Sequence, residues 1–203
     1  MKIINKDTKI FGSFSSNPGN NGCNYFNRLF QENGIDAIYK SFFSDNIQES
    51  VLAAKALKFS GFAVSMPFKV SVLEYVDNLD RAVKDIGAAN TVKITDGILS
   101  AYNTDWMGVY NYLLHPPKFI TILGNGGFSK AVQYACQKLD IDYKIITREE
   151  WDLVPNLDGT VFNATPIDVE VKGELIDGRP FTETGKKIAM LQAYEQYKIY
   201  INE

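Results

Sequence analysis

The chain has 203 residues, of which 45% are hydrophobic and 22% are charged, and its formal net charge is −3. This length and composition suit one large globular domain or two small ones with an apolar core. The small negative charge gives no electrostatic reason to expect nucleic acid or a membrane as a partner. Two separated cysteines, Cys23 and Cys136, indicate neither a disulfide framework nor a metal site. Without a signal-peptide core or an apolar stretch of roughly 20 residues, we expect a cytoplasmic protein.

The first third of the chain alternates strand-like and helix-like segments. Strands are expected over 8–15, 35–43 and 61–66, and helices over 25–34 and 47–59. The helices are indicated by apolar residues at helical spacing, and the strands by short β-branched and aromatic runs. A β-α-β-α-β succession is typical of a mainly parallel sheet covered by helices.

Lys69 follows the third of these strands. Pro67 ends the strand, and a helix is expected over 69–76, with the proline just before its first turn. Open α/β sheets bind their ligands beyond the strand ends, which makes Lys69 the first candidate functional residue. The alternative is a surface lysine in the first turn of a helix.

The next segment ends in a second candidate, Asp105. A short helix over 80–86 leads to a hairpin over 92–102, whose turn is the Asp96-Gly97 pair. A helix follows over 106–114, with Asp105 as its N-cap in the simplest interpretation. A lysine and a carboxylate beyond strand ends could form an acid–base pair that moves the proton of a reacting hydroxyl.

The rest of the chain predicts a second, smaller α/β domain. Strands are expected over 119–123, 143–147 and 160–166, and helices over 128–139 and 188–199. A proline pair after His115 separates this domain from the first one. His115 itself is interpreted as a linker residue.

A glycine-rich turn joins the first strand of this domain to its first helix. It comprises Gly124, Asn125, Gly126 and Gly127 and precedes Phe128. Such a turn brings backbone N–H groups close to a pyrophosphate, although glycines also form tight turns for structural reasons alone.

Thr147 and Arg148 end the following strand. An arginine there can accept the 2′-phosphate of NADP, whereas an acidic residue prefers the 2′-hydroxyl of NAD. The neighbouring Glu149 and Glu150 leave NAD possible, and a solvated loop arginine is the structural alternative.

Several small polar residues stand at strand ends in the first domain. Directional hydrogen bonds from such residues suit a polyhydroxylated ligand, although each alone is more often a turn or cap residue. They are Ser13, Ser15, Ser65, Asn90 and Asn103.

Six segments of the chain, taken together, resemble the shikimate dehydrogenases. They are Ala63–Lys69, Gly87–Thr91, Asn103–Gly108, Gly124–Ala131, Asn163–Pro166 and Gly185–Gln192. In the same order, that family has N-V-T-x-P-x-K, G-A-x-N-T, N-T-D-x-x-G, G-x-G-G-x-x-x-A, N-A-T-P and a glycine-to-glutamine motif. The A-V-S-M-P-F-K variant and the serines near residue 14 look more like the shikimate dehydrogenase-like branch.

The resemblance implies an α/β fold of two domains and an enzyme of aromatic amino acid biosynthesis, on the chorismate pathway. Residues 1–116 would form the substrate domain, 117–187 a reduced Rossmann-like NAD(P)-binding domain, and 188–203 a helix packing back on the first domain. The implied reaction is the NADP-dependent interconversion of shikimate, quinate or a close cyclic hydroxy acid and its 3-dehydro ketone. The resemblance is compatible with either a monomer or a homodimer.

The matching motif positions imply a role for particular residues. Lys69 and Asp105 would be the catalytic pair. The substrate would contact Ser13, Ser15, Ser65, Asn90 and Gln192. The cofactor would contact Gly124, Asn125, Gly126, Gly127, Phe128, Thr147, Arg148 and Thr165.

The sequence also departs from the family pattern. In S-x-S-P-x-x-H-N only the last asparagine, Asn27, is retained, and Gly22, Cys23 and Phe26 replace the serine, proline and histidine. Asp168 stands where N-A-T-P-x-G has glycine, near the expected nicotinamide position. The region from 119 to 203 is also short for a nucleotide-binding domain. These departures leave open a binding protein without competent cofactor binding, or an oxidoreductase acting on an analogue.

Overall fold

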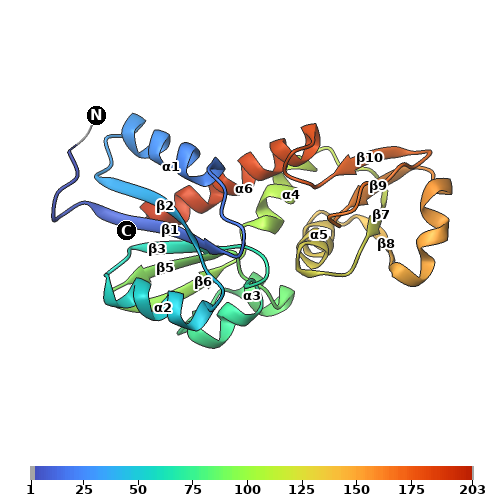
Figure 1. The fold of residues 1–203 in the computed structure, drawn as a ribbon. Helices are drawn as coiled ribbons and strands as arrows, with labels where there is room; N and C mark the ends of the chain where they lie inside the picture. The colour runs from blue at the N-terminus through green and yellow to red at the C-terminus, as the bar shows by residue number, and fades with distance from the viewer. Residues whose placement is uncertain (1–2, 203) are drawn as a thin grey trace. The chain divides into compact units, whose positions relative to one another are not determined.

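The computed structural model describes residues 3–202, which divide into two compact units. Unit 1 comprises residues up to Asn103 together with those from Gln196 onward, and unit 2 comprises Thr104–Glu195 (Figure 1). The sequence interpretation placed the segment up to 116 in the first domain, whereas this division assigns it to unit 2 from Thr104. The reason is packing, because Val109 and Leu113 share a buried core with the strands and helices of unit 2.

Unit 1 is built on a six-stranded mixed sheet with the order β2-β1-β3-β5-β6-β4. Its strands are β1 (Lys9–Ser15), β2 (Ala37–Phe43), β3 (Gly61–Val64), β4 (Asn78–Leu79), β5 (Thr91–Thr95) and β6 (Ile98–Tyr102). β1 is parallel to β2 and β3, and β5 is antiparallel to β3 and β6. The α/β class is confirmed, and the antiparallel part comes from the expected hairpin. Asp96 and Gly97 form its turn with φ of 51° and 79°.

Helices cover both faces of this sheet (Figure 1). They are α1 (Asn21–Glu32), α2 (Ile47–Ala56), α3 (Arg81–Ile86), the 3₁₀ helix η1 (Ser71–Tyr75) and the end of α6 (Glu183–Ile201). Asn46 and Asp80 cap α2 and α3 by accepting bonds from Glu49 N and Ala82 N. α6 begins earlier than the expected closing helix, and Tyr200 near its end packs 4.6 Å from Phe11 between ring centroids.

The alternation of β1 sends its side chains into two separate apolar layers. Phe14 joins the core beneath α2 and η1, together with Phe62 and Val72. Phe11 lies on the other face, 5.4 Å from Phe30 of α1 between ring centroids. Burying an aromatic side chain of this kind stabilises the fold by about 2–3 kcal/mol.

The expected helix opening at Lys69 is wrong. The structure has a turn after β3 and then η1, which begins at Ser71. The carbonyl of Lys69 accepts a bond of 2.8 Å from Ala89 N, so it is engaged by another segment. In an α-helix that carbonyl would instead accept a bond from the backbone N–H four residues later in the chain.

Unit 2 contains a four-stranded, wholly parallel sheet with the order β10-β9-β7-β8. Its strands are β7 (Phe119–Leu123), β8 (Asp142–Ile146), β9 (Thr160–Asn163) and β10 (Glu174–Asp177). Its helices are α4 (Asp105–Tyr112), α5 (Gly127–Lys138), the 3₁₀ segment η2 (Arg148–Asn156) and the first part of α6. Numbered in chain order, these strands lie as 2-1-3-4, which corresponds to strands 2-1-4-5 of the doubly wound order 3-2-1-4-5-6 and confirms a reduced Rossmann-like sheet.

The sheet has fewer strands than the full doubly wound arrangement because of the connection between β8 and β9. That connection is η2, a 3₁₀ segment of nine residues containing Pro155. Val154 of η2 packs in a buried core with Leu123 and Ile146, and the segment contributes no further strand.

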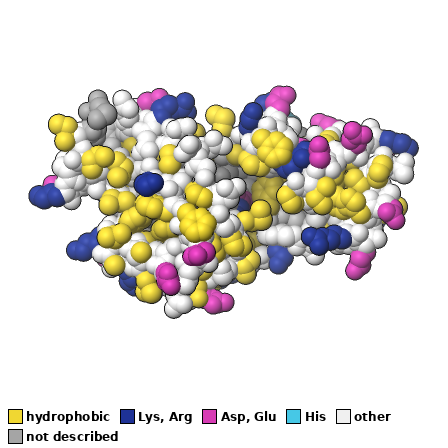
Figure 2. Space-filling model, in the orientation of Figure 1, with side chains coloured by type: hydrophobic (Ala, Val, Ile, Leu, Met, Phe, Trp, Pro, Cys, Tyr) yellow, Lys and Arg dark blue, Asp and Glu magenta, His cyan; other side chains and the backbone are white. Residues whose placement is uncertain are grey.

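Two observations concern partners of the whole chain. Within residues 3–202, no helix has the length and apolar character needed to cross a membrane. On the face drawn in Figure 2, acidic and basic side chains are interspersed and do not gather into a region of one sign.

Candidate active site

The polar candidates of unit 1 lie at one end of its sheet, where β1 and β3 finish and β5 begins; this end is called the polar edge below. Ser13 pairs with Ala63, Ala63 with Thr91, and Thr91 with Tyr102. Ser65 follows the end of β3, while Asn90 precedes the start of β5. Because β5 runs antiparallel to β3, its beginning lies at the same edge as the end of β3. Segments distant in sequence are thus brought together.

Backbone hydrogen bonds hold these segments in place. Val64 N donates to Asn90 O at 2.9 Å, and Ser65 N donates to Phe14 O at 3.1 Å. The bond from Ala89 N to Lys69 O at 2.8 Å ties the lysine's main chain to the residue before Asn90. The turn that carries Lys69 is therefore fixed to the central strands of the sheet.

The side chains at this edge differ in exposure. Asn90 is buried, and its amide oxygen accepts a bond of 3.0 Å from Thr91 Oγ1, which fixes the amide orientation. Lys69 is half-buried and Ser65 is exposed. Ser15 is buried at the end of β1, while Ser13 is half-buried.

In unit 2, Asp105 is the first residue of α4, and Thr104 takes the N-cap position that we expected for Asp105. Both side chains are buried, with Asp105 only 7% exposed. Gln192 Nε2 donates to Thr104 Oγ1 at 2.8 Å across 88 positions of sequence. Gln192 of the last motif therefore lies beside the start of α4.

Gly108 makes this arrangement possible. A methyl group there would lie 2.7 Å from Gln192 Cβ and 2.8 Å from Ile188 O. Real Cβ atoms essentially never approach so closely, so α4 and α6 pack backbone to backbone at this point. The glycine of N-T-D-x-x-G thus serves helix packing.

The glycine-rich turn of unit 2 joins β7 to α5 at the carboxyl edge of the parallel sheet. Gly124 has φ of 94°, and a methyl group there would lie 2.7 Å from Thr165 Cγ2. Gly126 is the N-cap of α5, where no side chain caps the helix and a methyl group would meet nothing within 4 Å. First-turn N–H groups beside open space suit a phosphate group.

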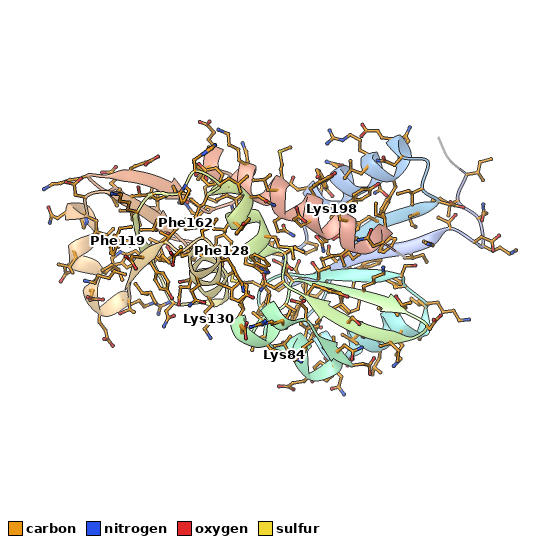
Figure 3. All side chains as sticks on the ribbon, turned by 180° about the vertical axis from the view of Figure 1, so that it is seen from behind. Lys84, Phe119, Phe128, Lys130, Phe162 and Lys198 are labelled. Carbon is orange, nitrogen blue, oxygen red and sulfur yellow. The ribbon has the colours of Figure 1, made fainter. Side chains whose placement is uncertain are left out.

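Ser129 and Phe128 complete the turn. Ser129 occupies the place of the missing third glycine, and its hydroxyl donates to Gly124 O at 2.6 Å. Phe128 packs 6.0 Å from Phe162 between ring centroids, and Gly178 leaves room for its ring (Figure 3). The Ser129 hydrogen bond and the packing of Phe128 on Phe162 thus hold the turn in place.

Arg148 lies directly beyond β8, after Thr147 at the N-cap of η2. Its side chain is exposed, and among the described residues no salt bridge involves it. Glu150 is paired instead with Lys144, Nζ to Oε1 at 3.3 Å. One of the two acidic residues that follow Arg148 is therefore partly neutralised.

Asp168 does not carry an uncompensated charge. Its side chain is 87% exposed and forms a salt bridge with Arg179. Arg179 is also paired with Asp177, Nη2 to Oδ2 at 2.6 Å, at the end of β10. The sequence interpretation missed Arg179 and Asp177, because neither belongs to a motif and only the fold brings them to Asp168.

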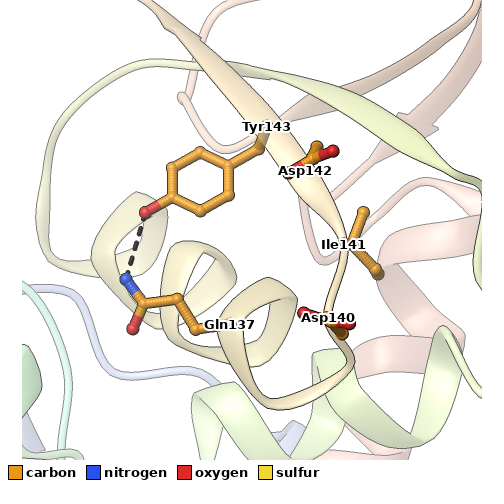
Figure 4. Close-up of a pocket in the computed structure, with 5 residues that line it drawn as sticks. All are labelled: Gln137, Asp140, Ile141, Asp142 and Tyr143. Carbon is orange, nitrogen blue, oxygen red and sulfur yellow. Dashed lines mark hydrogen bonds between the residues drawn. The ribbon is translucent and has the colours of Figure 1, made fainter.

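A separate surface pocket of 360 Å³ lies at the opposite end of β8 (Figure 4). Gln137, Asp140, Ile141, Asp142 and Tyr143 line it. It is near the start of β8, away from the glycine turn and Arg148, so it is not part of the candidate site. Within residues 3–202, no group of three or more His, Cys, Asp or Glu side chains is placed to hold a metal ion.

The fold and its polar sheet edges define a two-unit α/β protein with a Rossmann-like second unit. The model of the shikimate dehydrogenase substrate-binding domain matches residues 22–92. A shikimate dehydrogenase-like protein of Haemophilus influenzae is 35% identical over 134 residues, which are 64% of this chain and 49% of that protein. A shikimate dehydrogenase (NADP(+)) of Aquifex aeolicus is 35% identical over 67% of this chain and 54% of its own length.

Solved structures agree with these matches. The shikimate 5-dehydrogenase-like protein HI0607 superposes with a TM-score of 0.82 and 25% identity, covering 99% of this chain and 94% of that chain. The chain is therefore similar in sequence to shikimate dehydrogenases over about two thirds of its length, and similar in fold to a shikimate 5-dehydrogenase-like protein over nearly all of it. The sequence matches span about half the length of the curated relatives.

Proposed function

We propose that the protein is an NADP-dependent oxidoreductase that interconverts shikimate, quinate or a close cyclic hydroxy acid and its 3-dehydro ketone. The observation that carries this proposal is the convergence of Ser65, Lys69 and Asn90 at one edge of the unit 1 sheet. The resemblance of the six motifs and the names of the curated relatives support the reaction class.

The proposed roles follow from the chemistry of a ring hydroxyl. Its oxidation removes a proton from oxygen and a hydride from the attached carbon. In the proposal, Lys69 accepts and returns the hydroxyl proton, and Asp105 is its partner in the acid–base pair. Ser13, Ser15, Ser65, Asn90 and Gln192 bind the other hydroxyls and the carboxylate.

The residues of unit 2 fit a dinucleotide. The uncapped start of α5 beside Gly126 suits the pyrophosphate, and Arg148 suits the 2′-phosphate. Asn125, Gly127, Phe128, Thr147 and Thr165 would complete the cofactor site. NADP, when bound, supplies or accepts the hydride.

A panel of shikimate, quinate and their analogues with NADP⁺ and NAD⁺ tests this reaction through the absorbance of the reduced nicotinamide. We expect turnover with at least one acid, and faster turnover with NADP⁺. Lys69→Met should lower kcat by roughly 10²-fold or more, the usual contribution of a general acid–base. Lys84→Met, at an exposed position of α3, is the matched control. A folded sample without turnover on any acid would refute the proposal.

A second candidate is a binding protein that keeps the cyclic-acid site without competent cofactor binding. The observation that favours it is the four-stranded sheet, in which η2 replaces any strand beyond β8. Titration calorimetry separates the two candidates. Binding of shikimate together with NADP(H) supports the enzyme, and binding of shikimate alone supports the binding protein.

A further inference from the structure

Tyr39 is a buried tyrosine of β2, an edge strand of the unit 1 sheet, and is 4% exposed. Its backbone is held by the side-chain amide of Asn27 in α1. Asn27 Nδ2 donates to Tyr39 O at 2.8 Å, and Tyr39 N donates to Asn27 Oδ1 at 2.8 Å. One side chain therefore satisfies both main-chain groups of this residue and leaves Tyr39 little freedom.

Three of the positions that depart from S-x-S-P-x-x-H-N contact this tyrosine or its strand. A methyl group on Gly22 would lie 3.1 Å from Tyr39 Cε1 and 3.5 Å from its hydroxyl. The Phe26 ring stacks on the Tyr39 ring with centroids 4.5 Å apart. Cys23 Sγ accepts a bond of 3.2 Å from Ser41 N, two residues along β2. The altered residues thus form one local arrangement around Tyr39.

Ser13 pairs with Ser41 across β1 and β2, two residues along from Tyr39, so the Ser13 and Tyr39 side chains lie as diagonal neighbours on the same face of the sheet. Burial raises the pKa of Tyr39 far above its usual value, so the phenol is neutral at any working pH. A neutral phenol can donate one hydrogen bond and accept others, so a phenol beside a serine can limit the rotation of the serine hydroxyl. Ser13 lies on β1, in the row that leads to the polar edge of the sheet.

We infer that Tyr39 is a positioning residue for substrate binding, which orients the Ser13 hydroxyl toward a carboxylate or hydroxyl of the ligand. The glycine at position 22 leaves space for the phenol, where the family pattern has a serine. This inference rests on the proposed function. It adds to that function a residue from β2 that no motif contains.

The test is a double-mutant cycle of Tyr39→Phe and Ser13→Ala in the full chain, with shikimate as the ligand. Affinity is measured by calorimetry, kcat and KM by turnover, and folding by the thermal unfolding midpoint. Tyr200→Phe is the matched control, because it removes another buried hydroxyl of unit 1, which accepts from Gln196 Nε2 at 2.9 Å. A neutral hydrogen bond predicts a loss of affinity of roughly 3- to 10-fold.

We expect Tyr39→Phe to raise KM and Kd by that factor with kcat unchanged, and the double variant to bind as Ser13→Ala does. The inference would be overturned if the affinity losses of the two single variants multiplied in the double variant. Unchanged affinity in Tyr39→Phe, or an equal loss of affinity in Tyr200→Phe, would also overturn it. Should Tyr39→Phe fail to fold, unchanged affinity in Ser13→Ala would overturn it. A wild-type protein that binds neither shikimate nor any other acid of the panel refutes the proposed function as well, and so separates the two failures.

Discussion

Substituting Gly108 by alanine tests whether α4 and α6 are in backbone contact in unit 2. The new methyl group would lie 2.7 Å from Gln192 Cβ, 2.8 Å from Ile188 O and 2.9 Å from Gln192 N. Two of these atoms belong to the backbone of a long helix, which cannot move aside alone. Overpacking of this severity costs about 3 kcal/mol, and the better helix propensity of alanine returns about 1 kcal/mol. We therefore expect unit 2 to lose about 2 kcal/mol of stability.

Urea denaturation followed by tryptophan fluorescence measures this loss, because both tryptophans, Trp106 and Trp151, belong to unit 2. Gly19→Ala is the control, since a methyl group there meets nothing within 4 Å. The displaced helix should also lengthen the bond from Gln192 to Thr104 and raise KM. A Gly108→Ala protein within 0.5 kcal/mol of the wild type, roughly the range of harmless surface changes, would refute the packing argument.

Three further perturbations follow from the geometry of unit 2. Arg179→Met should lower the free energy of unfolding in urea denaturation because the buried Asp177 carboxylate loses the guanidinium that pairs with it, whereas Asp168→Asn at the exposed end should have a smaller effect. Equal losses would contradict this assignment. Burial raises the pKa of Cys136 to about 11 from 9.0, so its contribution to stability is complete below pH 9 and is lost as pH rises toward 11. Cys136→Ala should therefore flatten the fall in unfolding free energy between pH 9 and 11, and an unchanged slope would argue against it. Gly126→Ala should keep the unfolding midpoint and weaken NADP(H) binding in calorimetry, because the methyl group projects into open space at the start of α5. Unchanged NADP(H) affinity would place the pyrophosphate elsewhere.

Local patterns in the sequence predicted most elements of both units. The Asp-Gly pair at 96–97 required positive φ, and the structure has a hairpin there. The continuous apolar run before Gly124 predicted a buried parallel strand, and β7 is the central strand of such a sheet. In each case the decisive interactions lie within a few residues of sequence.

Predictions failed where a distant segment competes for the same atoms. The helix expected at Lys69 is replaced by a turn, because Ala89 N binds the Lys69 carbonyl. The fold also supplies a partner that the sequence did not indicate, because Arg179 pairs with Asp168 from the loop after β10. Neither Ala89 nor Arg179 carries a signal near the residue that it contacts.

The sequence by itself determined the α/β class, the two-part organisation and the motifs that resemble those of the shikimate dehydrogenases. Only the tertiary structure decided that Ser65, Lys69 and Asn90 share one sheet edge, because this depends on β5 running antiparallel to β3. It also brought Gln192 to Thr104, and it placed Tyr39 and Ser13 on the same face of neighbouring strands. Propensity and periodicity act between neighbours in the chain, whereas strand register and helix packing join residues that are far apart in it.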